Sequence, residues 1–231
     1  MSRTVLFARE PLRSPFTLAL LVAIPVLFVV SAAGALSDFA TALGGSLAGD
    51  AAVALSAGWA GAFISGALGF FQAASSRGAD RRLALAGLGP LRVATARIGA
   101  SVLLAFLAAA GAFGALELRT GVAHPWHAAA AVMAFALIYL GIGVLVGSLV
   151  SAPLEGSLLV VFVFLLDAFA GPGMSASPPI WAISQKVADI LIAAGAGAGS
   201  PTADWLGAGA VALLSLVAAT AVFVVSARSR V

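Results

Sequence analysis

Charged residues are scarce in this sequence. They make up 9% of its 231 residues, while 62% are hydrophobic. A soluble domain needs about 25% charged residues to cover its surface, so most of the surface of this chain must face something other than water. Lipid is the environment that fits. The length allows one membrane domain, residues 1–231, and leaves little for a separate soluble domain.

Cysteine is absent. This excludes disulfides, thiolate chemistry and cysteine-ligated metals. Lysine occurs once, at Lys186, which follows Gln185 and not a Gly-rich turn, so the chain cannot bind ATP through a P-loop. The net charge of +3 does not indicate nucleic-acid binding, because the basic residues are nearly all Arg in short segments between apolar runs.

Histidine occurs only at His124 and His127. Three residues apart, they could share a helix face and hold a metal, but without a nearby carboxylate pair an interfacial role is favoured. Ser65, in Ile64-Ser65-Gly66, resembles the serine of intramembrane proteases, yet no apolar segment carries the histidine that would activate it. We therefore expect no enzymatic activity and no cofactor or metal in this chain.

Six apolar segments are long enough to cross a hydrocarbon core of ~30 Å. They cover residues 16–36, 53–74, 98–116, 128–150, 154–170 and 205–225. The fifth is the shortest and ends at Gly171-Pro172-Gly173, a strong break. The expected fold class is an all-α integral membrane protein with six transmembrane helices.

The distribution of basic residues predicts that both termini lie in the cytoplasm. In that orientation the outer segments hold only Arg119 and Lys186. The cytoplasmic segments hold ten Arg residues: Arg3, Arg9, Arg13, Arg77, Arg81, Arg82, Arg92, Arg97, Arg228 and Arg230. Trp126 and Trp205 fall at outer boundaries, where indole rings prefer to lie.

The N-terminal region allows a second interpretation. Its Arg residues, its apolar run and Ala33-Gly34-Ala35 resemble a cleaved signal peptide. The apolar run is longer than that of a usual signal peptide, so a retained first span is favoured.

Two cytoplasmic segments lie outside these spans. Residues 2–14 could form a short amphipathic helix in the inner interface, although a plain basic flank is favoured. In the loop 75–97, Asp80 is expected to cap a short helix with apolar Leu83, Leu85 and Leu88, ended by Gly89-Pro90. That helix suits either docking on a cytosolic partner or contact with lipid headgroups, and the sequence does not favour one over the other.

An outer segment, residues 171–204, precedes the last span. From Pro178-Pro179 to Leu191 it shows an amphipathic helical pattern with polar Gln185, Lys186 and Asp189. This helix of about three turns is too polar to span a membrane. We expect it to dip into the edge of the bilayer.

Ionisable residues inside the spans are few. Asp167 is one, and such residues mark transport pathways by default. A local hydrogen-bonding role near the outer surface is favoured over a pathway role. Small residues are patterned: Gly58, Gly61, Gly66 and Gly69 in the second span, and Gly143 and Gly147 in the fourth, permit close helix approach.

The order of these segments resembles the membrane subunit of type-2 ABC exporters. Arg9-Glu10-Pro11-Leu12-Arg13-Ser14-Pro15 is similar to the family's R-E-x-x-R-x-P ahead of the first span. The stretch from Gly78 through Leu83 to Pro90-Leu91-Arg92 is similar to its first cytoplasmic loop, and residues 178–191 look like its outer re-entrant helices. Ala79 stands where that family usually has Thr.

The resemblance implies a permease subunit of an ATP-driven exporter, multi-pass in a prokaryotic plasma membrane. Two copies, identical or paralogous, would form the pathway within membrane lipid, and separate cytosolic ATPases that bind ATP and Mg would drive it. A non-enzymatic scaffold or assembly factor is the alternative, with a secondary transporter third.

The residues that the resemblance points to fall into three groups. Asp80, Arg81, Arg82, Leu83, Leu85, Leu88 and Arg92 would couple to the ATPase. Arg9, Glu10 and Arg13 would belong to the helix before the first span. A pathway or gate would involve Asp167, Trp181 and Lys186.

Overall fold

The computed structural model describes residues 15–47, 49–83, 87, 89–150, 152–171, 174–175, 179 and 182–228. Their regular structure is helical, apart from an isolated antiparallel bridge between Gly44 and Ser175. The helices are α2 (Pro15–Ala42), α3 (Gly49–Leu83), α4 (Pro90–Thr120), α5 (Pro125–Leu149), α6 (Pro153–Ala170), α7 (Gln185–Gly195) and α8 (Thr202–Arg228).

Six of these helices, all except α7, are long and apolar enough to cross a membrane. Each overlaps one of the six spans predicted from the sequence, so the expected all-α, multi-pass membrane architecture is confirmed at this level. The helices are longer than the predicted spans at most ends. Hydropathy marks only the apolar part of a helix, while backbone hydrogen bonding continues into the flanking residues.

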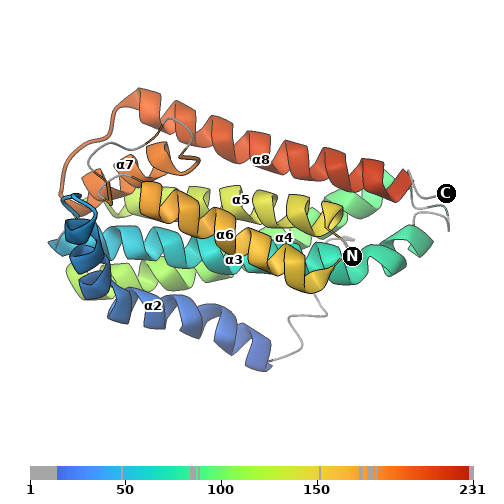
Figure 1. Cartoon of the computed structure of the whole chain (residues 1–231), viewed down its shortest axis with the longest axis horizontal. Helices are drawn as coiled ribbons and strands as arrows, with labels where there is room; N and C mark the ends of the chain where they lie inside the picture. Colours follow the sequence, from blue (N-terminus) through green and yellow to red (C-terminus); the bar gives the residue numbers. More distant parts are fainter. Residues whose placement is uncertain are drawn as a thin grey trace.

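Helices α3 and α5 form the centre of the bundle (Figure 1). Helix α3 contacts each of the other six helices. Helices α2, α6 and α8 lie at the periphery and expose large apolar side chains such as Leu27, Phe162 and Leu213. A soluble protein would bury such surface, so these faces are suited to lipid.

Glycine residues lie at the point where α3 and α5 cross and allow the two helices to approach closely. A Cβ at Gly143 would overlap the carbonyl oxygen of Gly66. A Cβ at Gly147 would lie 2.6 Å from the oxygen of Phe70, and one at Gly69 2.6 Å from the oxygen of Leu140. The glycine pattern therefore brings two backbones together within one chain, which the sequence alone did not determine.

Helix α3 is longer than a span requires. Its 35 residues extend roughly 52 Å at about 1.5 Å per residue, against a core of ~30 Å. In Figure 1 it runs further toward the right-hand end of the bundle than α5 or α6, and α8 ends on that side too. We refer to this side as the α3 end and to the opposite side as the α7 end.

The extension of α3 corrects one local prediction. Asp80 lies inside the last turns of α3, which ends at Leu83, and does not begin a separate helix. Residues 75–83 contain Ala, Arg and Leu, which favour helix, and no proline to stop it. The helix of the second span therefore continues unbroken through this segment.

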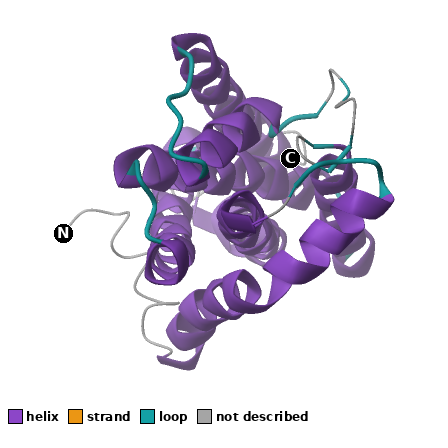
Figure 2. Cartoon of the chain, turned by 90° about the vertical axis from the view of Figure 1, so that its left-hand side faces the viewer, coloured by secondary structure: helices purple, strands orange, loops and turns teal. Residues whose placement is uncertain are grey.

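Helix α7 occupies the opposite end, which faces the viewer in Figure 2. It spans Gln185–Gly195, and it packs against α3, α5 and α8. The predicted helix at 178–191 starts too early, because Ala182 N donates to Pro179 O and Gln185 N to Ala182 O in turns that precede α7. With 11 residues, α7 is too short to span a bilayer.

Candidate functional site at the base of α7

Asp167 is the centre of a buried polar cluster. It lies on α6 and is only 3% exposed. The hydroxyl of Tyr139 on α5 donates to its Oδ2 at 2.5 Å, and the backbone N–H of Ser184 donates to its Oδ1 at 3.2 Å. Both carboxylate oxygens thus have a protein donor, and three segments meet at one side chain. The local hydrogen-bonding role favoured from the sequence is what the structure displays.

The contact with Ser184 fixes the start of α7. Ser184 is the residue before the first turn, and its own side chain makes no capping hydrogen bond. A carboxylate from α6 accepts a backbone N–H there instead. A negative charge at a helix N-terminus is favourable because the free N–H groups carry partial positive charge. Asp167 therefore links the end of α6 to the beginning of α7.

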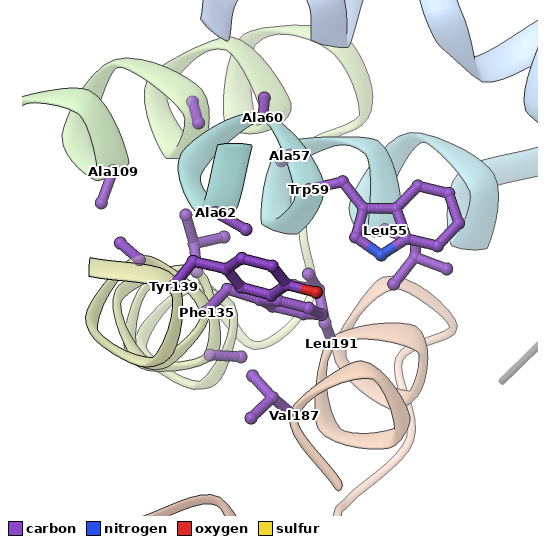
Figure 3. Close-up of a cluster of buried hydrophobic side chains, with 14 of the residues drawn as sticks. Leu55, Ala57, Trp59, Ala60, Ala62, Ala109, Phe135, Tyr139, Val187 and Leu191 are labelled. Carbon is purple, nitrogen blue, oxygen red and sulfur yellow. The ribbon is translucent and has the colours of Figure 1, made fainter. Parts of the chain in front are cut away.

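Aromatic and aliphatic side chains enclose this cluster. Phe164 packs edge-on against Tyr139, with ring centroids 5.6 Å apart. Tyr139 and Phe135 from α5 point into the same space as Val187 and Leu191 from α7 (Figure 3). A Cβ at Gly58 of α3 would lie 2.7 Å from both Phe135 and Leu191, so glycine lets α7 sit close to the central helices.

A second polar contact holds α7 on its exposed side. Lys186 Nζ lies 2.8 Å from Asp204 Oδ1 of α8. The hydrogen bond to Asp204 and its charge raise the pKa of Lys186. Burial, followed by the charge of Asp204, raises the pKa of the half-buried Asp189, while Lys186 opposes the shift. Polar links to α6 and α8 therefore hold α7 in place.

The structure describes two of the three predicted pathway residues. Asp167 is buried between helices, Lys186 is in an exposed ion pair, and Trp181 lies outside the described residues. Within the described residues, the polar groups at the base of α7 form hydrogen bonds and an ion pair between helices, and these contacts position α7. A pathway or gate role for the three residues stays a prediction.

The two histidines lie at the α7 end of the bundle. Their ring centroids are 5.4 Å apart, and His127 packs on Trp205 of α8 at 5.3 Å. The contact of His127 with Trp205 joins the beginning of α5 to the beginning of α8. The side chain of His127 is exposed, which suits the interfacial role favoured from the sequence.

At the α3 end, Arg77 caps α5. Its Nε donates to Gly147 O at 3.0 Å, and its Nη2 donates to Gly147 O and Val150 O. The last carbonyls of a helix lack intrahelical donors, so a guanidinium is a good partner for them. Nearby, Ser101 of α4 donates to Gln72 of α3 at 2.5 Å. The extension of α3 is therefore tied to its neighbours by polar contacts.

The residues proposed for coupling are described in part. Arg82 is exposed and donates to Gly78 O at 3.2 Å, Leu83 is half-buried, and Arg92 is exposed on the first turn of α4. The side chains of Asp80 and Arg81, and the whole of Leu85 and Leu88, lie outside the described part of the chain, as do Arg9, Glu10 and Arg13.

Sequence reasoning missed the roles of Tyr139 and Arg77. Tyr139 is the only tyrosine and sits in the middle of an apolar run, where a buried hydroxyl needs a partner. Arg77 follows the second span directly and was counted only as a charge. Both are polar groups at membrane depth or its edge, which is the signal that could have identified them.

The fold defines an α-helical, multi-pass membrane protein. No family model matches the sequence, and a search of curated proteins finds no similar sequence.

Proposed function

We propose that this chain is the permease subunit of an ATP-driven ABC exporter. Two permease subunits, identical or paralogous, form the substrate pathway, and separate cytosolic ATPases bind and hydrolyse ATP. The observation that best supports this proposal is the form of α3, which is at once the most central helix and the one that continues beyond its span toward the link with α4.

A partner that binds the α3 end acts on the core directly. Helix α3 contacts each of the other six described helices, so a displacement of its extension acts on all of them. Arg77 joins the extension to the end of α5, and the glycine crossing joins the same two helices further along. These contacts are close and partly polar. A movement of the α3 extension therefore displaces the helices packed against it.

The surface at this end suits a protein partner. Arg82, Leu91 and Arg92 are exposed on either side of the α3–α4 link. Apolar and basic groups side by side provide both buried area and charge for a docking surface. The resemblance of the sequence 78–92 to the first cytoplasmic loop of type-2 exporters supports docking of the ATPase at this end.

The alternatives differ in what they require. A secondary transporter needs ionisable groups that a coupling ion can reach, whereas Asp167 has both oxygens engaged by donors of the protein. A scaffold or assembly factor needs a partner but no ATP turnover. The ATPase is therefore the discriminating feature.

The test is reconstitution with an ATPase. The tagged chain is coexpressed with each ABC-type ATPase of its source genome in turn, purified and placed in liposomes. We expect a stable complex that hydrolyses ATP, and no hydrolysis by this chain alone. Replacing Leu85 and Leu88 together with Asp is expected to release the ATPase while the chain still inserts, because insertion depends on the apolar runs.

The matched control is Leu118→Asp. This leucine is exposed on the last turns of α4, at the opposite end from the α3–α4 link. It is expected to leave the complex intact. Retention of the ATPase by the Leu85/Leu88 variant rejects the docking surface, and absence of any ATPase complex, or ATP turnover by the chain alone, rejects the permease assignment.

A further inference from the structure

An apolar cavity lies between α2, α3 and α6. Its volume is about 170 Å³. The lining residues all have apolar side chains: Ile24, Pro25 and Phe28 from α2, Ala60, Phe63 and Ile64 from α3, and Phe164 from α6. It is separate from the polar cluster at Asp167 but shares Phe164 with it.

The cavity lies at the depth of the hydrocarbon core. The α2 residues that line it fall inside the candidate span Leu18–Ala42, and the α3 residues fall near the middle of Gly49–Ala79. Ile24 is 41% exposed and Ala60 only 3% exposed. The space therefore extends from the lipid-facing surface down to the central helix.

The surrounding helices shape this opening. Phe39 of α2 and Phe169 of α6 pack together with ring centroids 5.0 Å apart, toward the α7 end. Pro25 lies inside α2 at the cavity wall. Proline removes one backbone N–H and disturbs the preceding turn of a helix. The proline of α2 on one side and the aromatic contact at one end border a recess between α2 and α6.

The chemistry of the walls selects the occupant. Apolar cavities of about 150 Å³ stay dry and take apolar ligands, because water there finds no hydrogen-bond partners. A charged or hydrogen-bonding headgroup likewise finds none. The recess is continuous with the exposed apolar faces of α2 and α6, where lipid chains are the neighbouring phase.

We propose that this cavity binds the hydrocarbon chain of a bilayer lipid. The chain enters between α2 and α6, and the lipid headgroup stays at the membrane interface. Bound in this way, the chain contacts Phe164, whose ring also packs against Tyr139 and Phe63. One aromatic side chain thus has lipid on one face and the Tyr139–Asp167 cluster on another. The site depends on the membrane fold and not on an ATPase partner.

The experiment uses photocrosslinking from lipid. The full chain is reconstituted in phosphatidylcholine vesicles in which one acyl chain carries a mid-chain diazirine, then illuminated and mapped by mass spectrometry. We expect adducts on Ala60 and Phe164, which are only 3% and 8% exposed. Adducts on exposed Leu213 serve as the reference for ordinary lipid contact, and buried Ala136 of α5 should carry none.

Two variants fill the cavity from opposite walls. Ala60→Leu and Phe28→Trp should each remove the Phe164 adduct while the Leu213 adduct persists. Ala218→Leu, the same change on the exposed face of α8, should leave both adducts. If a filled variant fails to fold, the adduct map of the unmodified protein still decides.

Three results would each overturn the proposal. The first is a map with adducts on exposed residues and none at Ala60 or Phe164. The second is a Phe164 adduct that persists in both filled variants. The third is a covalent dimer, without lipid adduct, when a photoreactive phenylalanine replaces Phe28. That result would assign the recess to a second copy of the chain.

Discussion

The hydroxyl of Tyr139 and the carboxylate of Asp167 meet at 2.5 Å across the interface of α5 and α6, although 28 residues separate them in the sequence. A carboxylate at 3% exposure is stable only when donors replace the water it has lost. Tyr139 supplies one donor and the backbone of Ser184 the other. Because the chain has a single tyrosine, this relationship can be tested by one substitution.

Tyr139→Phe is expected to destabilise the protein by about 1–2 kcal/mol. Hydrogen bonds to charged groups contribute about 1.5–3 kcal/mol in soluble proteins. Hydrogen bonds between helices in membranes average only about 0.6 kcal/mol, so the expected loss lies between these values. The thermal midpoint in detergent measures the change. Ser157→Ala removes a hydroxyl that bonds only within α6 and should have little effect. Equal midpoints for parent and Tyr139→Phe would contradict the prediction.

Gly143→Ala should be far more damaging than its size suggests. The added methyl group overlaps the backbone of Gly66, so α3 and α5 must separate. Overpacking of this kind costs about 1–3 kcal/mol or more. Size-exclusion profile and thermal midpoint are the measurements. Gly114→Ala on α4 has open space within 4 Å and should be neutral or stabilising. An unchanged thermal midpoint in Gly143→Ala would contradict the close contact between Gly66 and Gly143.

Arg77→Lys keeps the charge but loses the planar guanidinium. Lysine cannot donate to Gly147 O and Val150 O with the same fixed geometry. We expect a loss of about 1 kcal/mol and faster hydrogen exchange in the last turn of α5. Arg82→Lys changes an exposed residue that bonds its own helix, and should stay within about 0.5 kcal/mol of the parent. If hydrogen exchange in the last turn of α5 is unchanged, Arg77 does not cap that helix.

Asp189→Asn should stabilise the protein at neutral pH and lose that advantage in acid. Burial and the charge of Asp204 raise the pKa of Asp189 above its ordinary value of 3.8. The folded state therefore holds the proton more tightly, and the charged form opposes folding above the raised pKa. Below about pH 3.8 both states are protonated and the penalty vanishes. Thermal midpoints at pH 7 and pH 3.5 test this, and a pH-independent difference would argue against it.

Membrane orientation can be tested on a chain without background thiols. Ser46→Cys lies exposed at the α7 end, and Arg82→Cys lies exposed at the α3 end. The Arg distribution predicts that an impermeant thiol reagent labels Ser46→Cys in intact cells and reaches Arg82→Cys only after lysis. Ser76 is unsuitable because its side chain is buried. The reverse labelling pattern would invert the proposed orientation.

The sequence predicted the six long apolar helices of the described residues and their approximate positions, because the length of an apolar run indicates which segments can cross lipid. It placed their ends poorly where polar residues continue a helix. Asp80 lies inside α3 because the Ala, Arg and Leu residues beside it favour helix and no proline interrupts the segment. The start of α7 was placed too early because residues 182–184 are not helical and α7 begins at Gln185.

The sequence could not predict which helices pack against each other, and the reason is physical. Gly143 and Gly147 predicted a close contact, but any helix with small residues could supply the partner. Asp167 predicted a hydrogen bond, while its donors come from α5 and from the residue before α7. Periodicity describes one helix at a time, and the choice of neighbour depends on how all side chains pack together.

The glycine crossing restricts how this protein can change shape. Side chains between helices act as adjustable spacers that can exchange rotamers when one helix slides past another, and at Gly66 and Gly143 no such spacer exists. A shift of one residue along the axis would replace Gly143 with Ile142 or Val144 and force the backbones apart. Helices α3 and α5 must therefore move together as one rigid unit. Helix α8 is held to α5 in a similar way, because a Cβ at Gly141 would lie 2.7 Å from the backbone of Ser215. Any change of shape is therefore left to α2 and α6.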